Sequence, residues 1–189
     1  MNAASLPLVL DRMAGRRILI VGDLCLDRYT WGDAERVSPE APVLVLRVDE
    51  QENRLGGAAS VAHLARGLGA EVSLASVVGS DAEGRLIAKL LLSSGIHHSA
   101  LRIDPARPTT LKERLVGRAG QRHAHQMLRV DRERRDLLDR DVEARLISAT
   151  LAQLKDCEAV LISDYGKGVC TPHLMKAVMQ GARDRTSVV

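Results

Sequence analysis

The sequence contains no phenylalanine, one tryptophan and two tyrosines among its 189 residues. Proteins that bind single-stranded nucleic acids stack bases on aromatic side chains, so this scarcity argues against a nucleic-acid partner. A formal net charge of +3 is small for this length and by itself indicates neither nucleic-acid nor membrane binding. Apolar residues make up 46% of the chain, so any core has to be built from Leu, Val, Ile and Ala.

Cysteines and long apolar runs are also scarce. Cys25, Cys157 and Cys170 are far apart, and no C-x-x-C pair suggests a zinc site or a redox dithiol, so we expect buried free thiols. The apolar piece at residues 6–10 is too short for a signal peptide, and no segment approaches the ~20 apolar residues of a membrane span. The sequence therefore predicts a cytoplasmic protein without a membrane partner.

Strand-like and helix-like segments alternate along much of the chain. Residues 17–21 form a continuous apolar run, which is typical of a strand buried on both faces of a parallel sheet. Further strands are expected at 72–78 and 159–162, and helices at 57–68, after a capping box of Ser80 and Glu83, at 139–155 and after Thr171-Pro172. This order predicts an α/β fold with helices on a doubly wound, parallel sheet.

Two segments and the end of the chain depart from this order. Residues 29–50 and 109–130 are polar and poor in helix formers, so we expect hairpins or extra strands that stand off the main sheet. Residues 185–189 come where the pattern calls for another strand. No linker divides the chain, so we expect one domain over residues 1–189 whose fold is unfinished.

Polar residues and glycines stand where the predicted elements begin or end. Asp23 and Asp27 follow the first strand, and Gly56-Gly57 opens a helix. Ligands of α/β enzymes bind at such positions, where a carboxylate can accept hydrogen bonds from sugar hydroxyls and glycines let a ligand approach the backbone. The alternative is that both aspartates cap turns or pair with Arg28 or Arg36.

A third cluster follows the strand at 159–162 and contains Asp164 and Lys167 in the order Asp164-Tyr165-Gly166-Lys167-Gly168. It is not a Walker A loop, because no glycine stands at Leu161 and no Ser or Thr follows Lys167. Any phosphate binding there has to use another architecture.

Basic residues are frequent between Lys112 and Arg135. Lys112 and Arg114 alternate along a probable strand, so both project from one face and could hold a phosphate. The alternative is a solvated basic face, since Arg118, Arg122, Arg129, Arg132, Arg134 and Arg135 follow. His123 and His125 also share a face, but without a third ligand nearby we expect no metal there.

Several motifs, in their order along the chain, resemble those of the ribokinase-like sugar kinases, and within them the bacterial D-glycero-β-D-manno-heptose 7-phosphate kinases. The matching motifs are Gly22-Asp23 with Asp27, residues 36–43, Gly56-Gly57-Ala58-Ala59, Arg107-Pro108-Thr109-Thr110 with Lys112 and Arg114, Leu128-Arg129-Val130-Asp131, and residues 163–168. The resemblance covers residues 17–189 and implies a helix-covered sheet, a β lid from the segments at about 29–50 and 109–130, and a homodimer formed through the lids.

The resemblance also implies an activity and site residues. The family's reaction is the ATP- and Mg²⁺-dependent phosphorylation of the heptose 7-phosphate to the 1,7-bisphosphate, on the pathway to ADP-heptose and the lipopolysaccharide core. Asp23, Asp27, Gly56 and Gly57 would hold the sugar, with Ser60 where the family usually has Asn. Lys112 and Arg114 would extend toward the sugar phosphate, with Asp164 near the sugar and Lys167 near the nucleotide phosphates.

One family motif is missing from the sequence. The catalytic aspartate of these kinases lies in a Gly-Ala-Gly-Asp loop, and the sequence contains no G-x-G-D. We therefore expect a truncated domain that holds the sugar-binding portion and lacks the nucleotide-binding half. The alternatives are a catalytically silent sugar-phosphate-binding or dimerisation module, and another sugar kinase of the same superfamily.

Overall fold

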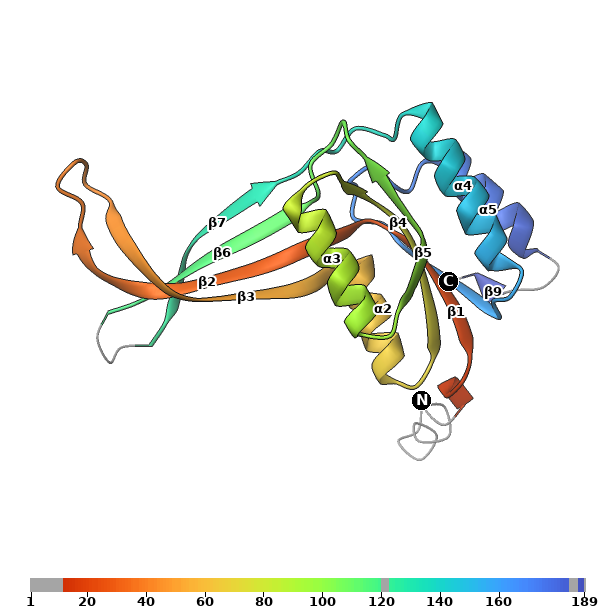
Figure 1. The fold of residues 1–189 in the computed structure, drawn as a ribbon, viewed down its shortest axis with the longest axis horizontal. Helices are drawn as coiled ribbons and strands as arrows, with labels where there is room; N and C mark the ends of the chain where they lie inside the picture. Colours follow the sequence, from red (N-terminus) through yellow and green to blue (C-terminus); the bar gives the residue numbers. More distant parts are fainter. Residues whose placement is uncertain (1–11, 120–122, 184–186, 189) are drawn as a thin grey trace.

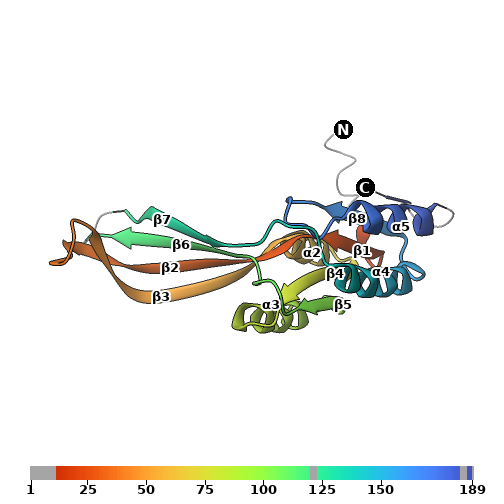
Figure 2. The same cartoon turned by 90° about the horizontal axis from the view of Figure 1, so that it is seen from above.

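The structure, a computed structural model, describes residues 12–119, 123–183 and 187–188. Its strands form a five-stranded sheet, in the order β5-β4-β1-β8-β9, and a four-stranded sheet, in the order β3-β2-β6-β7. We call them the core sheet and the lid sheet. In Figure 1 helices lie against the core sheet, and the lid sheet extends away from it; the view in Figure 2 shows the same separation.

The core sheet is parallel throughout and is covered by helices on both faces. Its strands are β1 (Arg17–Gly22), β4 (Glu71–Gly79), β5 (His97–Asp104), β8 (Ala159–Ser163) and β9 (Ser187–Val188), and the helices are α2 (Ala58–Gly67), α3 (Ala82–Ser93), α4 (Arg140–Leu154) and α5 (Pro172–Ala182). Side chains of β1 alternate between two apolar clusters. Ile20 packs with residues of α2 and α3, whereas Leu19 and Val21 pack with residues of α4 and α5. This three-layer arrangement confirms the predicted α/β fold class.

The strand at the edge of the core sheet, β5, was not predicted. It begins with the polar residues His97, His98 and Ser99, and only Ala100 and Asp104 within it are buried. A strand with one neighbour and few buried positions has no continuous apolar run, so its hydrophobic pattern is weak.

The start of α3 corrects one prediction. Asp81, and not Ser80, is the N-cap, and its carboxylate accepts a hydrogen bond from the Gly84 amide at 2.8 Å. Glu83 forms an ion pair with Arg28 in place of the reciprocal capping contact. The predicted cap at Thr171 is confirmed, because its hydroxyl accepts from the Leu174 amide at 3.0 Å.

The lid sheet is built from the two segments predicted to stand off the main sheet. Its strands are β2 (Leu24–Val37), β3 (Leu44–Gly57), β6 (Leu111–Arg118) and β7 (His125–Arg132). β2 pairs with β3 and β6 with β7 in antiparallel hairpins, and β2 and β6 join the hairpins in parallel. β2 begins directly after β1 and β3 runs directly into α2, so the base of the lid is continuous with the core.

Further predictions concern the two ends of the chain, the basic segment and membrane-spanning helices. The strand expected at the C-terminal end is present as β9, beside β8. Residues 1–11, Arg122, residues 184–186 and Val189 lie outside the described residues. Within the described part, no helix is long and apolar enough to cross a membrane.

Candidate functional site

Strand pairing brings the separate polar clusters to one place. Gly22 lies opposite Ser163 at the ends of β1 and β8, so Asp23 and the segment 164–169 emerge side by side. In the lid, Asp27 lies opposite Lys112 of β6. The base of the lid and the carboxyl edge of the core sheet therefore meet in one region.

A cavity of about 260 Å³ lies where they meet. It is lined by Asp23, Leu24, Cys25, Asp27, Gly56, Gly57, Ser60, Thr110, Lys112, Arg114, Tyr165 and Lys167. Every binding residue predicted from the sequence is in this set except Asp164. The roles of these residues toward a ligand stay predictions, whereas their juxtaposition is a property of the fold.

Asp23 organises the floor of the cavity. The residue is 2% exposed, and its carboxylate accepts hydrogen bonds from the backbone amides of Tyr165, Lys167 and Val169 at 2.8, 3.0 and 3.0 Å. Charge-assisted bonds of this kind are stronger than neutral ones, so Asp23 fixes the whole segment that follows β8. The turn-capping interpretation of Asp23 accounts for these contacts, and a contact with sugar stays a prediction.

Gly57 explains how α2 approaches this floor. It is the N-cap of α2, with a φ of 59°, and a Cβ at this position would lie 2.4 Å from the Asp23 carbonyl oxygen. Only glycine tolerates this combination of backbone conformation and close approach. The first turn of α2 therefore begins at the edge of the cavity, where both Gly57 and Ser60 contribute to the lining.

Asp27 and Arg114 form an ion pair across the lid. Arg114 Nη1 lies 2.6 Å from Asp27 Oδ1, and this bond raises the pKa of the guanidinium. The Arg114 guanidinium also lies 5.0 Å from the centre of the Tyr29 ring, within the range of a cation–π contact. The pairing alternative predicted Arg28 or Arg36 as partners, but Arg28 bonds to Asn53 and Glu83 instead.

The two lysines of the cavity differ in their partners. Lys167 Nζ lies 2.6 Å from Glu133 Oε2, and each side chain is 13% exposed; the lysine holds the pKa of Glu133 below its usual range. Lys112 forms no ion pair within residues 12–119, 123–183 and 187–188. Among the cationic side chains of the cavity, Lys112 is therefore the one that forms no ion pair with a described carboxylate.

Sequence and structure comparisons agree with this architecture. The model of the pfkB family carbohydrate kinases matches residues 16–177. The chain belongs to the pfkB family of carbohydrate kinases. The predicted resemblance to ribokinase-like kinases is confirmed.

Relatives of this pfkB family chain include proteins called Bifunctional protein HldE. The one from Geobacter metallireducens is 45% identical over 167 residues, which cover 88% of this chain and 33% of the relative. The one from Helicobacter hepaticus is 40% identical over 173 residues, covering 92% and 35%. The chain spans about a third of the length of these curated relatives.

Solved structures show the same fold at low sequence identity. Phosphofructokinase-2 from Escherichia coli in complex with fructose-6-phosphate matches with a TM-score of 0.62 and 16% identity, over 92% of this chain and 53% of that one. Arabidopsis thaliana ribokinase complexed with ribose and ATP matches with a TM-score of 0.56 and 18% identity, over 88% and 51%.

ATP and Mg²⁺ belong to the reaction of pfkB family kinases, but the candidate metal cluster of the described residues does not fit Mg²⁺. The one group of three close potential metal ligands found in the described part is Asp23, Asp164 and Cys170. Asp23 already accepts three backbone hydrogen bonds, and Mg²⁺ prefers oxygen ligands to a thiol. No glycine-rich G-x-G-D loop is present in the sequence. The described residues therefore offer no fitting ligand set for Mg²⁺.

Sequence reasoning missed four residues of the cavity lining: Leu24, Cys25, Thr110 and Tyr165. A signal existed for two of them. Cys25 lies midway between Asp23 and Asp27, and Thr110 stands two residues before Lys112, so the period of two along a strand places each on the face of its neighbours. Asp164 was predicted but is absent from the lining; it is exposed, and its carboxylate accepts from the Gly166 amide at 2.8 Å.

Proposed function

We propose that this chain is the sugar-binding portion of a kinase for D-glycero-β-D-manno-heptose 7-phosphate. The observation that carries the proposal is the cavity at the base of the lid, because it collects acidic and basic side chains from three separate parts of the sequence. A phosphorylated sugar needs both kinds of partner. Carboxylates accept hydrogen bonds from hydroxyls, and cations bind the phosphate.

The distribution of charge supports an anionic ligand. Two carboxylates, Asp23 and Asp27, face three cations, Lys112, Arg114 and Lys167, in the lining. Asp27 is paired with Arg114 and Lys167 with Glu133, which leaves Lys112 as the available positive charge. In our proposal the phosphate binds Lys112 and draws Arg114 and Lys167 away from their carboxylate partners toward it. Asp27 is then released to accept hydrogen bonds from the sugar.

The reaction that the family resemblance implies is phosphoryl transfer to the anomeric hydroxyl of the heptose. Such transfer depends on positioning and on charge stabilisation of the moving phosphoryl group. The Gly-Ala-Gly-Asp loop that supplies the base and the anion hole in the family is not in this sequence. We therefore propose that the 189 residues bind the sugar phosphate and do not turn it over alone, in the cytoplasm where ATP is available.

Exposed apolar residues of the lid favour a homodimer formed through the lids. Val37, Val43, Leu44, Val48, Leu128 and Val130 are all at least 46% exposed. Apolar side chains gathered on one exposed sheet commonly mark an interaction surface. A dimerisation module without catalysis is the second function that this observation supports.

Calorimetric titration of the chain tests the proposal. Heptose 7-phosphate is expected to bind more tightly than unphosphorylated heptose, fructose 6-phosphate or ribose, and ATP with Mg²⁺ is expected to yield no ADP above a mock preparation. Tighter binding of fructose 6-phosphate or ribose would assign the chain to another sugar kinase of the superfamily. Binding of none of these sugars, together with a dimer in sedimentation, would favour the dimerisation module.

A further inference from the structure

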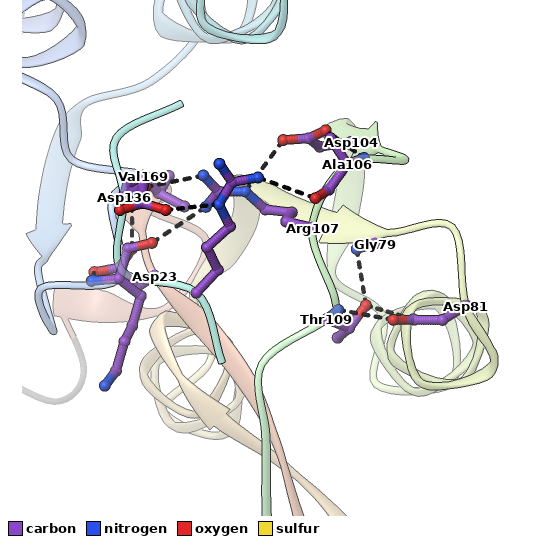
Figure 3. A network of polar contacts seen from close by, with 11 residues as sticks. Asp23, Gly79, Asp81, Asp104, Ala106, Arg107, Thr109, Asp136 and Val169 are labelled. Atoms are coloured by element: carbon purple, nitrogen blue, oxygen red, sulfur yellow. Dashed lines mark hydrogen bonds and ion pairs between the residues drawn. The ribbon is translucent and has the colours of Figure 1, made fainter. Parts of the chain in front are cut away.

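Arg107 is a buried arginine that lies outside the cavity yet contacts the segment that forms its rim. The residue is 8% exposed and follows β5. Its Nε donates to Asp104 Oδ2 at 3.1 Å, its Nη1 to the Lys167 carbonyl oxygen at 3.2 Å, and its Nη2 to the Asp136 carbonyl oxygen at 3.0 Å. Figure 3 shows the guanidinium between Asp104 and Asp136. Arginine suits this place because its planar fork donates in several fixed directions.

The two carbonyls belong to different connections of the chain. Asp136 lies in the segment 133–139 that leads from β7 of the lid to α4, and Lys167 lies in the segment 164–171 that leads from β8 to α5. These segments touch at Gly168, whose φ is 85° and where a Cβ would lie 2.0 Å from the Asp136 carbonyl oxygen. The Leu138 amide also donates to the Gly168 carbonyl oxygen at 3.3 Å. Arg107 therefore joins the segment 133–139, which leads out of the lid sheet, to the segment 164–171, which borders the cavity.

Lys167 is held at three separate points. Its amide donates to Asp23, its carbonyl accepts from Arg107, and its ammonium lies beside Glu133. Glu133 comes from the same segment as Asp136, so two of the three contacts depend on how the segment 133–139 is placed. Lys167 also lines the cavity, whereas Arg107 and Glu133 do not.

We propose that Arg107 is a positioning residue that sets the place of Lys167 at the cavity and thereby its contact with the anionic part of the ligand. The proposal rests on the proposed function for the identity of that ligand. Arg107 does not touch the ligand itself. Its hydrogen bonds to the carbonyl oxygens of Asp136 and Lys167 fix the backbone where the segments 133–139 and 164–171 touch. Without the guanidinium, Lys167 keeps only its contacts with Asp23 and Glu133.

Two variants separate positioning from mere stability. Arg107→Lys keeps a positive charge beside buried Asp104, but one ammonium cannot reproduce three donors in a fork. Asp104→Asn removes the charge partner and leaves the bonds from Arg107 to both carbonyls in place. Loss of one member of a buried ion pair destabilises a fold, so both variants are first compared by chemical denaturation. The double variant Asp104→Asn/Arg107→Met, which removes both charges, replaces Arg107→Lys if that protein does not fold.

The readouts are ligand affinity and amide hydrogen exchange. We expect Arg107→Lys to bind heptose 7-phosphate about tenfold more weakly, with binding of unphosphorylated heptose changed less than twofold and faster exchange in residues 164–169. Asp104→Asn is expected to keep both affinities and the slow exchange. Equal losses in the two variants, or equal losses for the two sugars, would overturn the proposal.

The exchange measurement also separates this proposal from the proposed function. If the wild-type chain binds no heptose 7-phosphate, the proposed substrate is wrong. Amide hydrogen exchange alone then tests whether Arg107 positions the segment 164–169. Faster exchange of residues 164–169 in Arg107→Lys, but not in Asp104→Asn, supports positioning of the rim. Unchanged exchange in Arg107→Lys contradicts it, whatever the ligand.

Discussion

The core sheet and the lid sheet are built from different kinds of residues. In the core sheet, β1 and β4 bury most of their side chains between helices. In the lid, every residue of β7 is exposed, and surface ion pairs such as Arg129–Asp131 replace apolar contacts. Apolar burial is therefore concentrated in the core sheet, whereas β7 of the lid keeps its side chains available for a ligand or a second chain.

The largest expected effect is that of truncating a buried leucine of the core sheet to alanine. Leu74 of β4 is fully buried, whereas Leu128 of β7 is 55% exposed. Leu74→Ala should lower the free energy of unfolding by about 2–5 kcal/mol through lost burial and a residual cavity. Leu128→Ala should change it by about 0.5 kcal/mol or less in the free chain. Urea denaturation measures the free energy of unfolding of both variants. Similar losses in the two would contradict this difference between the core sheet and the lid sheet.

The sequence predicted the core sheet better than the details of the site. Apolar runs predict buried strands such as β1, and polar segments poor in helix formers predict the lid. Pairing between distant residues leaves no such signal. That Arg114 bonds to Asp27, and Lys167 to Glu133, depends on strand register and loop packing. Ser80 was mistaken for the α3 cap because Ser and Asp, adjacent here, are both good N-cap residues and pattern alone does not choose between them.

The second prediction concerns phosphate recognition by the base of the lid. Replacing both Lys112 and Arg114 by Met should weaken heptose 7-phosphate binding by about 1.5–3 kcal/mol for each lost hydrogen bond to a charged group. Unphosphorylated heptose should lose much less, because it offers these donors no anion. Calorimetric titration with both sugars measures the difference.

A matched control for this pair exists on the helices. Lys89 of α3 and Lys176 of α5 are exposed and absent from the cavity lining. Replacing both by Met removes the same formal charge, so it should leave both affinities nearly unchanged. If the helix variant loses as much affinity as the lid variant, the basic residues act through general electrostatics, as the solvated-face alternative holds.

The third prediction concerns pairing of two copies through the lid. Leu128 and Val130 are exposed neighbours on one face of β7. If the lids pair there, Leu128→Lys with Val130→Lys should weaken the dimer by at least about 1.5 kcal/mol, the contribution of burying one such side chain. Sedimentation equilibrium measures the dissociation constant. A wild-type chain that stays monomeric at high concentration, or a variant that dimerises equally well, would place any interface elsewhere.

The smallest expected effect lies at the joint between core sheet and lid, where Cys25 is buried. Burial, with a further contribution from Asp27, raises the pKa of this thiol from 9.0 to about 11. The folded chain therefore holds the proton longer than the unfolded chain, so the stability contribution is complete below pH 9 and is lost as the pH rises toward 11. Between pH 8 and pH 9.5 the loss should be about 0.8 kcal/mol. Denaturation of wild type and Cys25→Ala at both pH values isolates this contribution, because the cost of the smaller side chain is the same at each pH. An equal fall in stability for both proteins would show that the Cys25 thiol ionises as readily in the folded chain as in the unfolded one.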